Sequence, residues 1–529
     1  MATKYWRGGA GAVAQVTTIT WSAYTSGETY TVTCNGKSVT FTATASTQSN
    51  VTSGIIAAIA AATTLNEFIE LTASDVSNTL TFTAAAGLPF TLTATATSGI
   101  TATVTNTTSA TGPNHFDNAQ NWVGAAVPSA GDDLVFDDSA YSVLYAIVDT
   151  TNYGDITIGS NFTGEIGLPP DNANGYREYR SRFLKLGDGA SASAVTIGLG
   201  DGRQSSRINI DANAEDLTVR VYGTGSPDAS GEYPVQLQGM GADSVVDVYD
   251  GQVAILSSSL TTLRVTPTEA TSNVRVYVDA ASTGQYLTQN GGYCEVRGSF
   301  TAEIENEGGV TRAVLNASCP SVKVGSGGTV FWETTSSVTG SVTVYNRGTI
   351  DLSRNGKSKS IQKVNLYAGG AYYDPLGIAQ VPGGIVHHGC RVEDVTLDLG
   401  ISKLITTSVL LSGLEVTDVE NADRNLTSYV TVLTDTPDAS NARTCRCVIE
   451  LGDGVKDLDA TGGVFNVKVL VGGVLLGGVA DSVTLGAVAR SVIQTNAFVV
   501  PANTAVIIQV LSPNAADVDV DTTATLLAE

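Results

Sequence analysis

The sequence predicts a mainly β protein in three parts. The largest part is a right-handed parallel β-helix-like solenoid. A small α+β module is inserted near the N-terminus, and an antiparallel β-sandwich of jelly-roll type follows at the C-terminus. Three observations predict this: a repeat of about twenty residues in the middle of the chain, a composition rich in strand formers, and different patterns on either side of the repeat. A fixed period of this size indicates a stacked array of short units.

Each repeat unit is a short strand, a glycine and another short strand. From Ser321 the units read SVKVGSGGTVFWETT, then SVTVYNRGTIDLS, then KVNLYAGGAYYDP. Glycines recur at intervals of 20, 20 and 21 residues, at Gly308, Gly328, Gly348 and Gly369. One unit cannot bury its own apolar face, so neighbouring units must stack. We therefore expect Val322, Val342 and Val364 to form one inward ladder, with each repeat glycine at a bend of positive φ.

The composition argues against nucleic acid and membranes as partners. The 529 residues carry 28 Lys and Arg against 51 Asp and Glu, a net charge of −23. Such a surface repels nucleic acid and anionic membranes, so we expect neither as a partner. The N-terminal segment lacks the apolar core of a signal peptide, and the most apolar run, from Val471, is too short to span a bilayer. The sequence thus predicts a soluble chain made in a cytoplasm.

Four regions are expected along the chain. Residues 1–12 and 112–215 form the N-terminal cap of the β-helix, and residues 13–111 form the inserted module. Residues 216–395 form the solenoid of twenty-residue repeats. Residues 396–529 carry longer strands with turn signals between them, which is typical of an antiparallel sandwich.

The module shows hairpin and helix signals. Asn35-Gly36 predicts a two-residue hairpin turn. An Ala-rich segment follows in which three isoleucines share one face of a short helix. These are Ile55, Ile56 and Ile59, and the candidate caps are Ser49, Asn50 and Thr52.

The module interrupts a pattern that otherwise reads as one unit. Tyr5-Trp6-Arg7-Gly8-Gly9 looks like the opening of a segment that resumes only at Asn121, as NWVGAAVPSAGDDLVF. We infer that the module is inserted between them, so that Trp6 and Trp122 are neighbours closing the first coil. Insertion at exposed loops is well tolerated. A separate N-terminal domain on a linker is the alternative.

The residues that could carry chemistry form no convincing site, so we predict no catalytic residue, cofactor or metal. The histidines, His115, His387 and His388, lack the setting of a triad, and the last two are expected in a surface loop. Acidic pairs at Asp132-Asp133 and Asp137-Asp138 could bind Ca²⁺ or hydrolyse glycosides, but they also suit turns beside a strand.

The six cysteines are scattered and are expected to be free, buried thiols. Cys445-x-Cys447 has the wrong spacing for a zinc knuckle, and we expect the two thiols to point to opposite faces.

One basic cluster stands out in this acidic chain. The segment GYREYRSRFLKL predicts a contact surface made by Tyr176, Arg177, Tyr179, Arg180 and Arg182. It could meet a neighbouring subunit or another partner, or pair within the chain with Asp137, Asp138 or Glu165. A second candidate interface lies in the apolar C-terminal run, at Phe498 and Ile507.

Three stretches resemble virion proteins of tailed bacteriophages. They are AVAQVTTIT with TYTVTCNGKSVTFTATA, NWVGAAVPSAGDDLVF with FTGEIGLP and GYREYR, and the C-terminal SVIQTNAFVVPANTAVIIQVLSPNAADVDVDTTATLLAE. The resemblance covers roughly half the chain. It carries over no catalytic residue.

This resemblance implies a non-enzymatic protein on the virion surface, released from the host by lysis. A capsid decoration (cement or head-fibre) protein that contacts the major capsid protein is the first hypothesis, and a homotrimer is expected. A tail fibre or receptor-binding protein that contacts host glycans is the alternative, and a β-helical polysaccharide depolymerase is the third.

Overall fold

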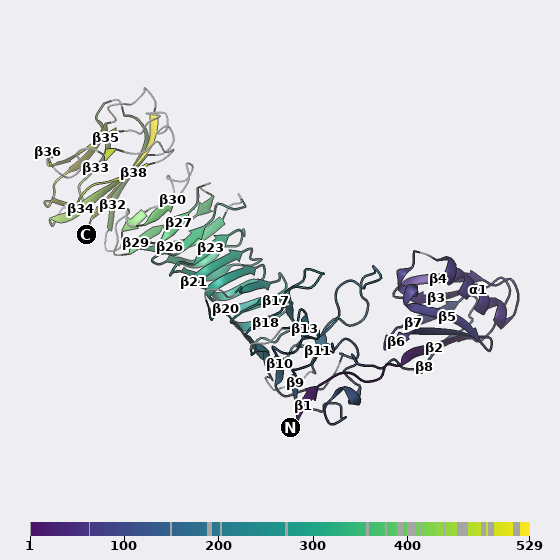
Figure 1. Cartoon of the computed structure of the whole chain (residues 1–529). Coiled ribbons are helices and arrows are strands. Elements are labelled where there is room, and N and C mark those ends of the chain that lie inside the picture. The colour runs from purple at the N-terminus through teal and green to yellow at the C-terminus, as the bar shows by residue number, and fades with distance from the viewer. Residues whose placement is uncertain are drawn as a thin grey trace. The chain divides into compact units, whose positions relative to one another are not determined.

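A computed structural model describes most of the chain. The described residues are 2–62, 64–148, 151–187, 193–200, 204–269, 273–355, 359–375, 378–388, 395–398, 409–411, 415–426, 428–437, 440–451, 464–477, 483–484, 491–511 and 519–528. They are mainly β, with one α-helix among them (Figure 1). They form two compact units, one of residues 1–261 with 267–276 and the other of residues 262–266 with 277–529.

The first unit contains two rows of parallel strands. One row joins β1 (Thr3–Trp6), β9 (Asp133–Phe136), β10 (Ile156–Gly159), β12 (Ser193–Leu199), β14 (Leu217–Val221) and β16 (Val245–Val248). The other joins β11 (Leu184–Lys185), β13 (Ile208–Asp211), β15 (Val235–Gln238) and β17 (Gln252–Leu256). From β10 to β17 the chain alternates between the rows, because each strand pairs with the strand two positions later.

The second unit repeats this alternation. One row joins β20 (Thr283–Val296), β21 (Ser299–Ala313), β22 (Cys319–Val324), β24 (Val338–Val344), β26 (Lys359–Tyr367), β29 (Ile385–His388) and β31 (Val409–Leu411). The other joins β21 again with β23 (Thr329–Trp332), β25 (Thr349–Asp351), β27 (Ala371–Tyr373) and β30 (Thr396–Asp398). The short β28 (Ala379–Gln380) pairs with β26. β18 (Ser259–Val265) and β19 (Arg275–Val278) contribute residues to both units.

A ladder of aliphatic side chains runs through the second unit's parallel strands. Its register pairs Ile304 with Val322, Val322 with Val342, Val342 with Val364, and Val364 with Ile385. All five side chains are fully buried. The predicted ladder of Val322, Val342 and Val364 is therefore confirmed. Alternation along each strand places the intervening residues on the opposite face.

The glycines recur in the repeat for a different reason from the one expected. Only Gly369 has a positive φ, of 79°. At Gly308, Gly328 and Gly348 the prediction of positive φ is wrong, and the constraint is space. A Cβ at Gly348 would lie 2.3 Å from the carbonyl oxygen of Val324, one repeat earlier. Successive repeats pass too closely at these turns for any side chain.

The module consists of two antiparallel sheets and a helix. One sheet has the order β5 (Leu71–Val76), β6 (Thr79–Ala86), β2 (Ala14–Trp21), β8 (Ala102–Thr108), and the other the order β4 (Lys37–Thr42), β3 (Thr29–Cys34), β7 (Leu92–Ala96). Asn35 and Gly36 form the expected turn between β3 and β4, both with positive φ. Helix α1 (Gln48–Ala61) buries Ile55, with Ile56 and Ile59 packed against the same core. Its cap is Thr47, whose side chain accepts from the Asn50 amide, so none of the three expected caps is used.

The ends of the module lie side by side. Val13 and Thr111 form an antiparallel bridge where the chain enters and leaves the module. Trp6 and Trp122 are in contact as expected, with ring centroids 5.2 Å apart in an edge-to-face arrangement. Both indoles are buried, and Phe116 and Phe136 pack around Trp122. The chain after the module therefore resumes directly beside the strand that precedes it, beyond the short helix η2 (Ala119–Asn121).

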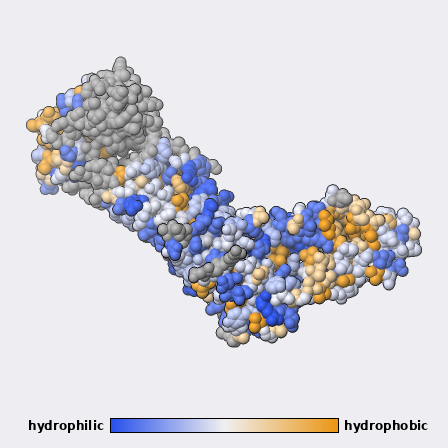
Figure 2. Space-filling view, in the orientation of Figure 1, coloured by the Kyte–Doolittle hydropathy of each residue, from blue (hydrophilic) through white to orange (hydrophobic). Residues whose placement is uncertain are grey.

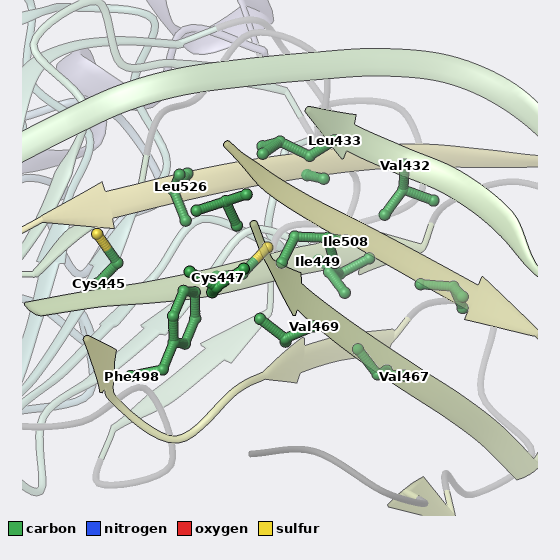
Figure 3. Packing of buried hydrophobic residues seen from close by; sticks show 14 of the residues in the cluster. Val432, Leu433, Cys445, Cys447, Ile449, Val467, Val469, Phe498, Ile508 and Leu526 are labelled. Carbon is green, nitrogen blue, oxygen red and sulfur yellow. The ribbon is translucent and has the colours of Figure 1, made fainter. Parts of the chain in front are cut away.

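The C-terminal part of the second unit contains two antiparallel sheets. The first joins β32 (Glu415–Asn425), β41 (Asp519–Ala528), β34 (Arg443–Leu451) and β38 (Ser491–Gln494), with β39 (Phe498–Val500) also paired to β34. The second joins β33 (Val430–Asp435), β40 (Val506–Leu511), β35 (Val464–Val471) and β36 (Val474–Leu475), with β37 (Val483–Thr484) paired to β35. Both sheets contribute side chains to one hydrophobic cluster, which includes Cys447, Ile449, Val469, Phe498 and Ile508 (Figure 3).

An isosteric pair of variants tests the ladder. Val342→Thr places a hydroxyl at a fully buried position, so we expect a loss of about 1–3 kcal/mol in the free energy of unfolding. Thr343→Val makes the reverse change on the opposite face, where the half-buried Thr343 hydroxyl accepts only one long hydrogen bond, of 3.4 Å, from Asn365, and it should alter the free energy by no more than about 1 kcal/mol. Thermal unfolding followed by circular dichroism compares the two. Equal effects would contradict the interior position of Val342.

Candidate functional site

The predicted basic cluster lies on a small hairpin between β10 and β11. Asp171 and Arg177 form an antiparallel bridge, and the Asn172 amide donates to the Tyr176 carbonyl at 2.7 Å. The Glu178 amide donates to Pro170 at 2.8 Å, which closes the base of the hairpin. These backbone bonds present the aromatic and basic side chains that follow Gly175 to the inserted module.

Arg180 is the centre of this junction. Its Nη1 donates to both carboxylate oxygens of Glu178 at 3.1 Å, and its Nη2 pairs with Glu70. Its Nε donates to the carbonyl of Pro89 at 2.8 Å. Glu70 ends the short helix η1 (Asn66–Glu70) of the module, so this one guanidinium connects the hairpin of residues 170–178 to two separate module segments.

The junction is almost completely desolvated. The side chains of Arg180, Glu70 and Glu178 are 8%, 6% and 1% exposed. Burial by itself lowers the pKa of Arg180, but Tyr179, Glu178 and Glu70 together raise it above its ordinary value. The guanidinium therefore stays charged between two carboxylates. Breaking such a buried pair leaves an uncompensated charge, which is strongly destabilising.

Aromatic rings cover the charged group. The Arg180 guanidinium lies 4.6 Å from the Tyr179 ring centroid, and the Tyr179 and Tyr176 rings stack at 6.0 Å. Burial raises the pKa of Tyr179. It also raises the pKa of the neighbouring Cys34 thiol to about 11. The cluster that the sequence predicts as a contact surface is thus used largely inside the chain.

The predicted intramolecular partners of the basic cluster are wrong. Arg180 pairs with Glu70 and Glu178, and Arg182 pairs with Glu232. Glu165 is instead the partner of Arg207.

The other predicted interface residues fall into different environments. Arg177 is exposed, whereas Tyr176 is buried. In the C-terminal sheets Phe498 is a core residue, only 4% exposed, and Ile507 is half-buried between the buried Val506 and Ile508. A contact with a partner at these positions stays a prediction.

The histidines occupy structural positions. The expected loop at His387 and His388 is wrong, because both residues belong to strand β29. The His388 ring stacks on Tyr367 at 4.8 Å and its Nε2 lies 2.9 Å from Asn365 Oδ1, and burial lowers its pKa. His115 is buried with its Nε2 2.9 Å from the Gly87 carbonyl.

The acidic pairs serve as turn residues where their contacts are defined. Asp132 accepts from the backbone amides of Ala2 and Ser129, and these bonds lower its pKa. Asp133 accepts from the Asp155 amide and Asp137 from the Asp138 amide. Over the described ranges, no three His, Cys, Asp or Glu side chains gather as metal ligands would.

Five cysteines are free and buried, as predicted, and Cys390 lies outside the described residues. Cys445 and Cys447 share one hydrophobic cluster, so the expectation that they point to opposite faces is wrong. Residues two apart on a strand lie on the same face.

The module's contribution to the junction was missed from the sequence. Between residues 13 and 111 there are four acidic residues, Glu28, Glu67, Glu70 and Asp75, and one basic residue, Lys37. The motif NEFIE holds two of the four acids and was a signal that this segment could receive the arginines. The pairing itself spans 110 residues of sequence and has no local pattern.

Comparison with known proteins adds no family. The chain matches no protein-family model and no curated protein. In the part of the chain that the structure describes, no helix is long and apolar enough to cross a membrane.

Removing the central arginine tests the junction. Arg180→Ala leaves the Glu70 and Glu178 carboxylates buried together, so we expect a loss of about 3–5 kcal/mol at the junction. Faster hydrogen exchange in residues 66–70 and 170–182 measures it. Arg297→Ala is the matched control: its side chain is 47% exposed and pairs with Glu295, and its loss should cost less than about 1 kcal/mol. If hydrogen exchange in the hairpin is unchanged in Arg180→Ala, the ion pairs of Arg180 do not hold the module against the hairpin.

Thiol reactivity tests the buried cysteines. Burial raises the pKa of Cys319 and Cys445 to about 11 and that of Cys294 to about 12. Because the thiolate is the reactive form, we expect Cys34 and these three, with Cys447, to resist iodoacetamide at pH 8 in the native chain. All five should react in denaturant. Peptide mapping by mass spectrometry reads each site, and native labelling of Cys447 would contradict its place in the core.

Proposed function

We propose that the parallel strands form a β-helix and that the C-terminal sheets form a β-sandwich. Three observations support the β-helix: pairing between strands two positions apart, alternation between two rows, and a buried ladder advancing by about twenty residues. Two antiparallel sheets that share one hydrophobic cluster support the sandwich.

On this architecture we propose a non-enzymatic structural role on the outer surface of a phage virion, as a capsid decoration or head-fibre protein. The observation that carries the proposal is the long ladder of stacked parallel strands, since such an array is stiff and binds through extended surfaces. Hydrophilic residues dominate the face of these strands in Figure 2, and the net charge of −23 suits a position away from packaged DNA.

A homotrimer is part of this proposal. In the C-terminal sheets several large apolar side chains are exposed, among them Val474 at 67%, Val499 at 62% and Leu475 at 54%. Val474 and Leu475 form the short edge strand β36. Exposed apolar groups on an edge strand are a liability unless another chain covers them.

A tail fibre or receptor-binding protein is the second candidate. The observation that favours it is a row of stacked rings on the parallel strands: Tyr345 lies 5.0 Å from Tyr367, which stacks on His388. Tyr345 is 38% exposed, and aromatic side chains are frequent in binding surfaces. A polysaccharide depolymerase is the third hypothesis, and incubation with purified host capsule followed by sugar analysis tests it.

Copy number separates the first two candidates. We expect quantitative mass spectrometry of purified particles to find this chain in hundreds of copies, in a simple ratio to the major capsid protein, because decoration follows the capsid lattice. A few copies per particle would favour the fibre instead. Absence of the chain from particles that are otherwise complete would overturn both.

A further inference from the structure

A pocket of about 340 Å³ lies where the module meets the hairpin of residues 170–178. It is next to Arg180 and its partners Glu70 and Glu178, but none of these three residues lines it. Its lining comes from two separate segments of the module and from the tip of the hairpin. The lining residues are Asn35, Lys37, Thr64, Asn66, Glu67, Gly175, Tyr176 and Arg177.

Two cations line this pocket without an acidic partner. Lys37 and Arg177 are both exposed, and no ion pair joins either to an acid within the described ranges. Arg180 and Arg182, in the same segment as Arg177, are both paired. In a chain with 51 acidic and 28 basic residues, these two cations lie together at one concave site. They create a local attraction for an anion.

The pocket also presents a carboxylate. Glu67 is only 4% exposed, and it accepts from the Asn35 side chain at 3.3 Å. A fully charged ion without hydrogen-bond donors, such as sulfate, would meet repulsion there. A ligand that carries hydroxyl donors beside its negative charge would find an acceptor instead.

The walls are held in place before any ligand binds. Asn35 lies in the hairpin turn between β3 and β4, with φ 48°. The hairpin tip is tied to the module because Asn174 Nδ2 donates to Glu70 at 3.2 Å. Gly175 packs beside Asn66, whose Nδ2 would lie 3.6 Å from an added Cβ. A pre-formed site loses less entropy on binding.

We propose that this pocket binds a hexuronic acid unit of an acidic polysaccharide. The ring carboxylate pairs with Lys37 and Arg177, and ring hydroxyls donate to Glu67 and contact Asn35 and Asn66. The volume is at the low end for ligand pockets and suits one sugar ring with part of a neighbour. The inference does not rest on the proposed virion role, since a decoration protein and a receptor-binding protein could each carry such a site.

Titration of the full chain with tetragalacturonate, followed by calorimetry, tests the proposal. Each cation makes a charge-assisted hydrogen bond, so Lys37→Ala and Arg177→Ala should each weaken binding about tenfold, and the double variant should abolish it. Arg264→Ala, which removes an exposed arginine outside the pocket, is the matched control and should bind like the wild-type chain.

Two further probes complete the experiment, one a neutral oligosaccharide and the other a simple anion. Maltotetraose should not bind, because it lacks the carboxylate, and inorganic sulfate should not compete. The proposal is overturned if tetragalacturonate does not bind, if the double variant binds it unchanged, or if sulfate displaces it fully. Circular dichroism of each variant shows whether the fold is retained. These outcomes are independent of the copy number in particles.

Discussion

The parallel ladder requires the chain to return to the same lateral position about once every twenty residues. Two consequences follow in the second unit. The ladder positions must be filled by side chains that match the residues one repeat before and after, as at Val322, Val342 and Val364. Every turn must let the backbone of one repeat pass over the last, as at Gly348. Because both requirements recur about every twenty residues, the sequence repeats with the same period.

In this acidic chain, the contact between the module and the hairpin of residues 170–178 is built around a buried arginine, Arg180. On the parallel strands, Arg312 pairs near the surface with Glu333 and Glu295. Arg180 and Arg207 are each 8% exposed, but the carboxylates beside Arg180 are more deeply buried: Glu70 and Glu178 are 6% and 1% exposed, against 27% and 18% for Glu165 and Asp228. A desolvated pair of this kind contributes geometric specificity more than net stability. It fixes which face of the module meets the hairpin, and it leaves Arg177 free to line a pocket.

Much of the β architecture was predictable from the sequence because the relevant signals are local or periodic. The twenty-residue period located the ladder and its register, and Asn35-Gly36 located a hairpin turn. The aromatic pair Trp6 and Trp122 was predictable across the module because two halves of one pattern were recognisable. The role of the repeat glycines was misjudged, since a close approach between repeats leaves the same sequence signal as a positive φ.

The candidate site was less predictable because its contacts are long-range. The sequence located Tyr176, Arg177 and Arg180 as a basic, aromatic cluster, but not the module residues that receive them. Glu70 and Pro89 reach Arg180 only through the tertiary fold. The loop expected at His387 and His388 failed for a simpler reason: a histidine pair after Ile385 and Val386 continues a strand, and the stacking partner Tyr367 comes from an earlier repeat.

The bridge between Val13 and Thr111 has a consequence for how such a protein can change over time. Because entry and exit lie side by side, any domain with adjacent termini could occupy this place without disturbing the tryptophan contact at Trp6 and Trp122. The position is therefore a site of domain insertion. Exchange of the module by recombination would alter what the chain displays, while the repeats that carry it stay the same. A replacement domain would have to provide new partners for Arg180, His115 and Asn174, which contact the present module.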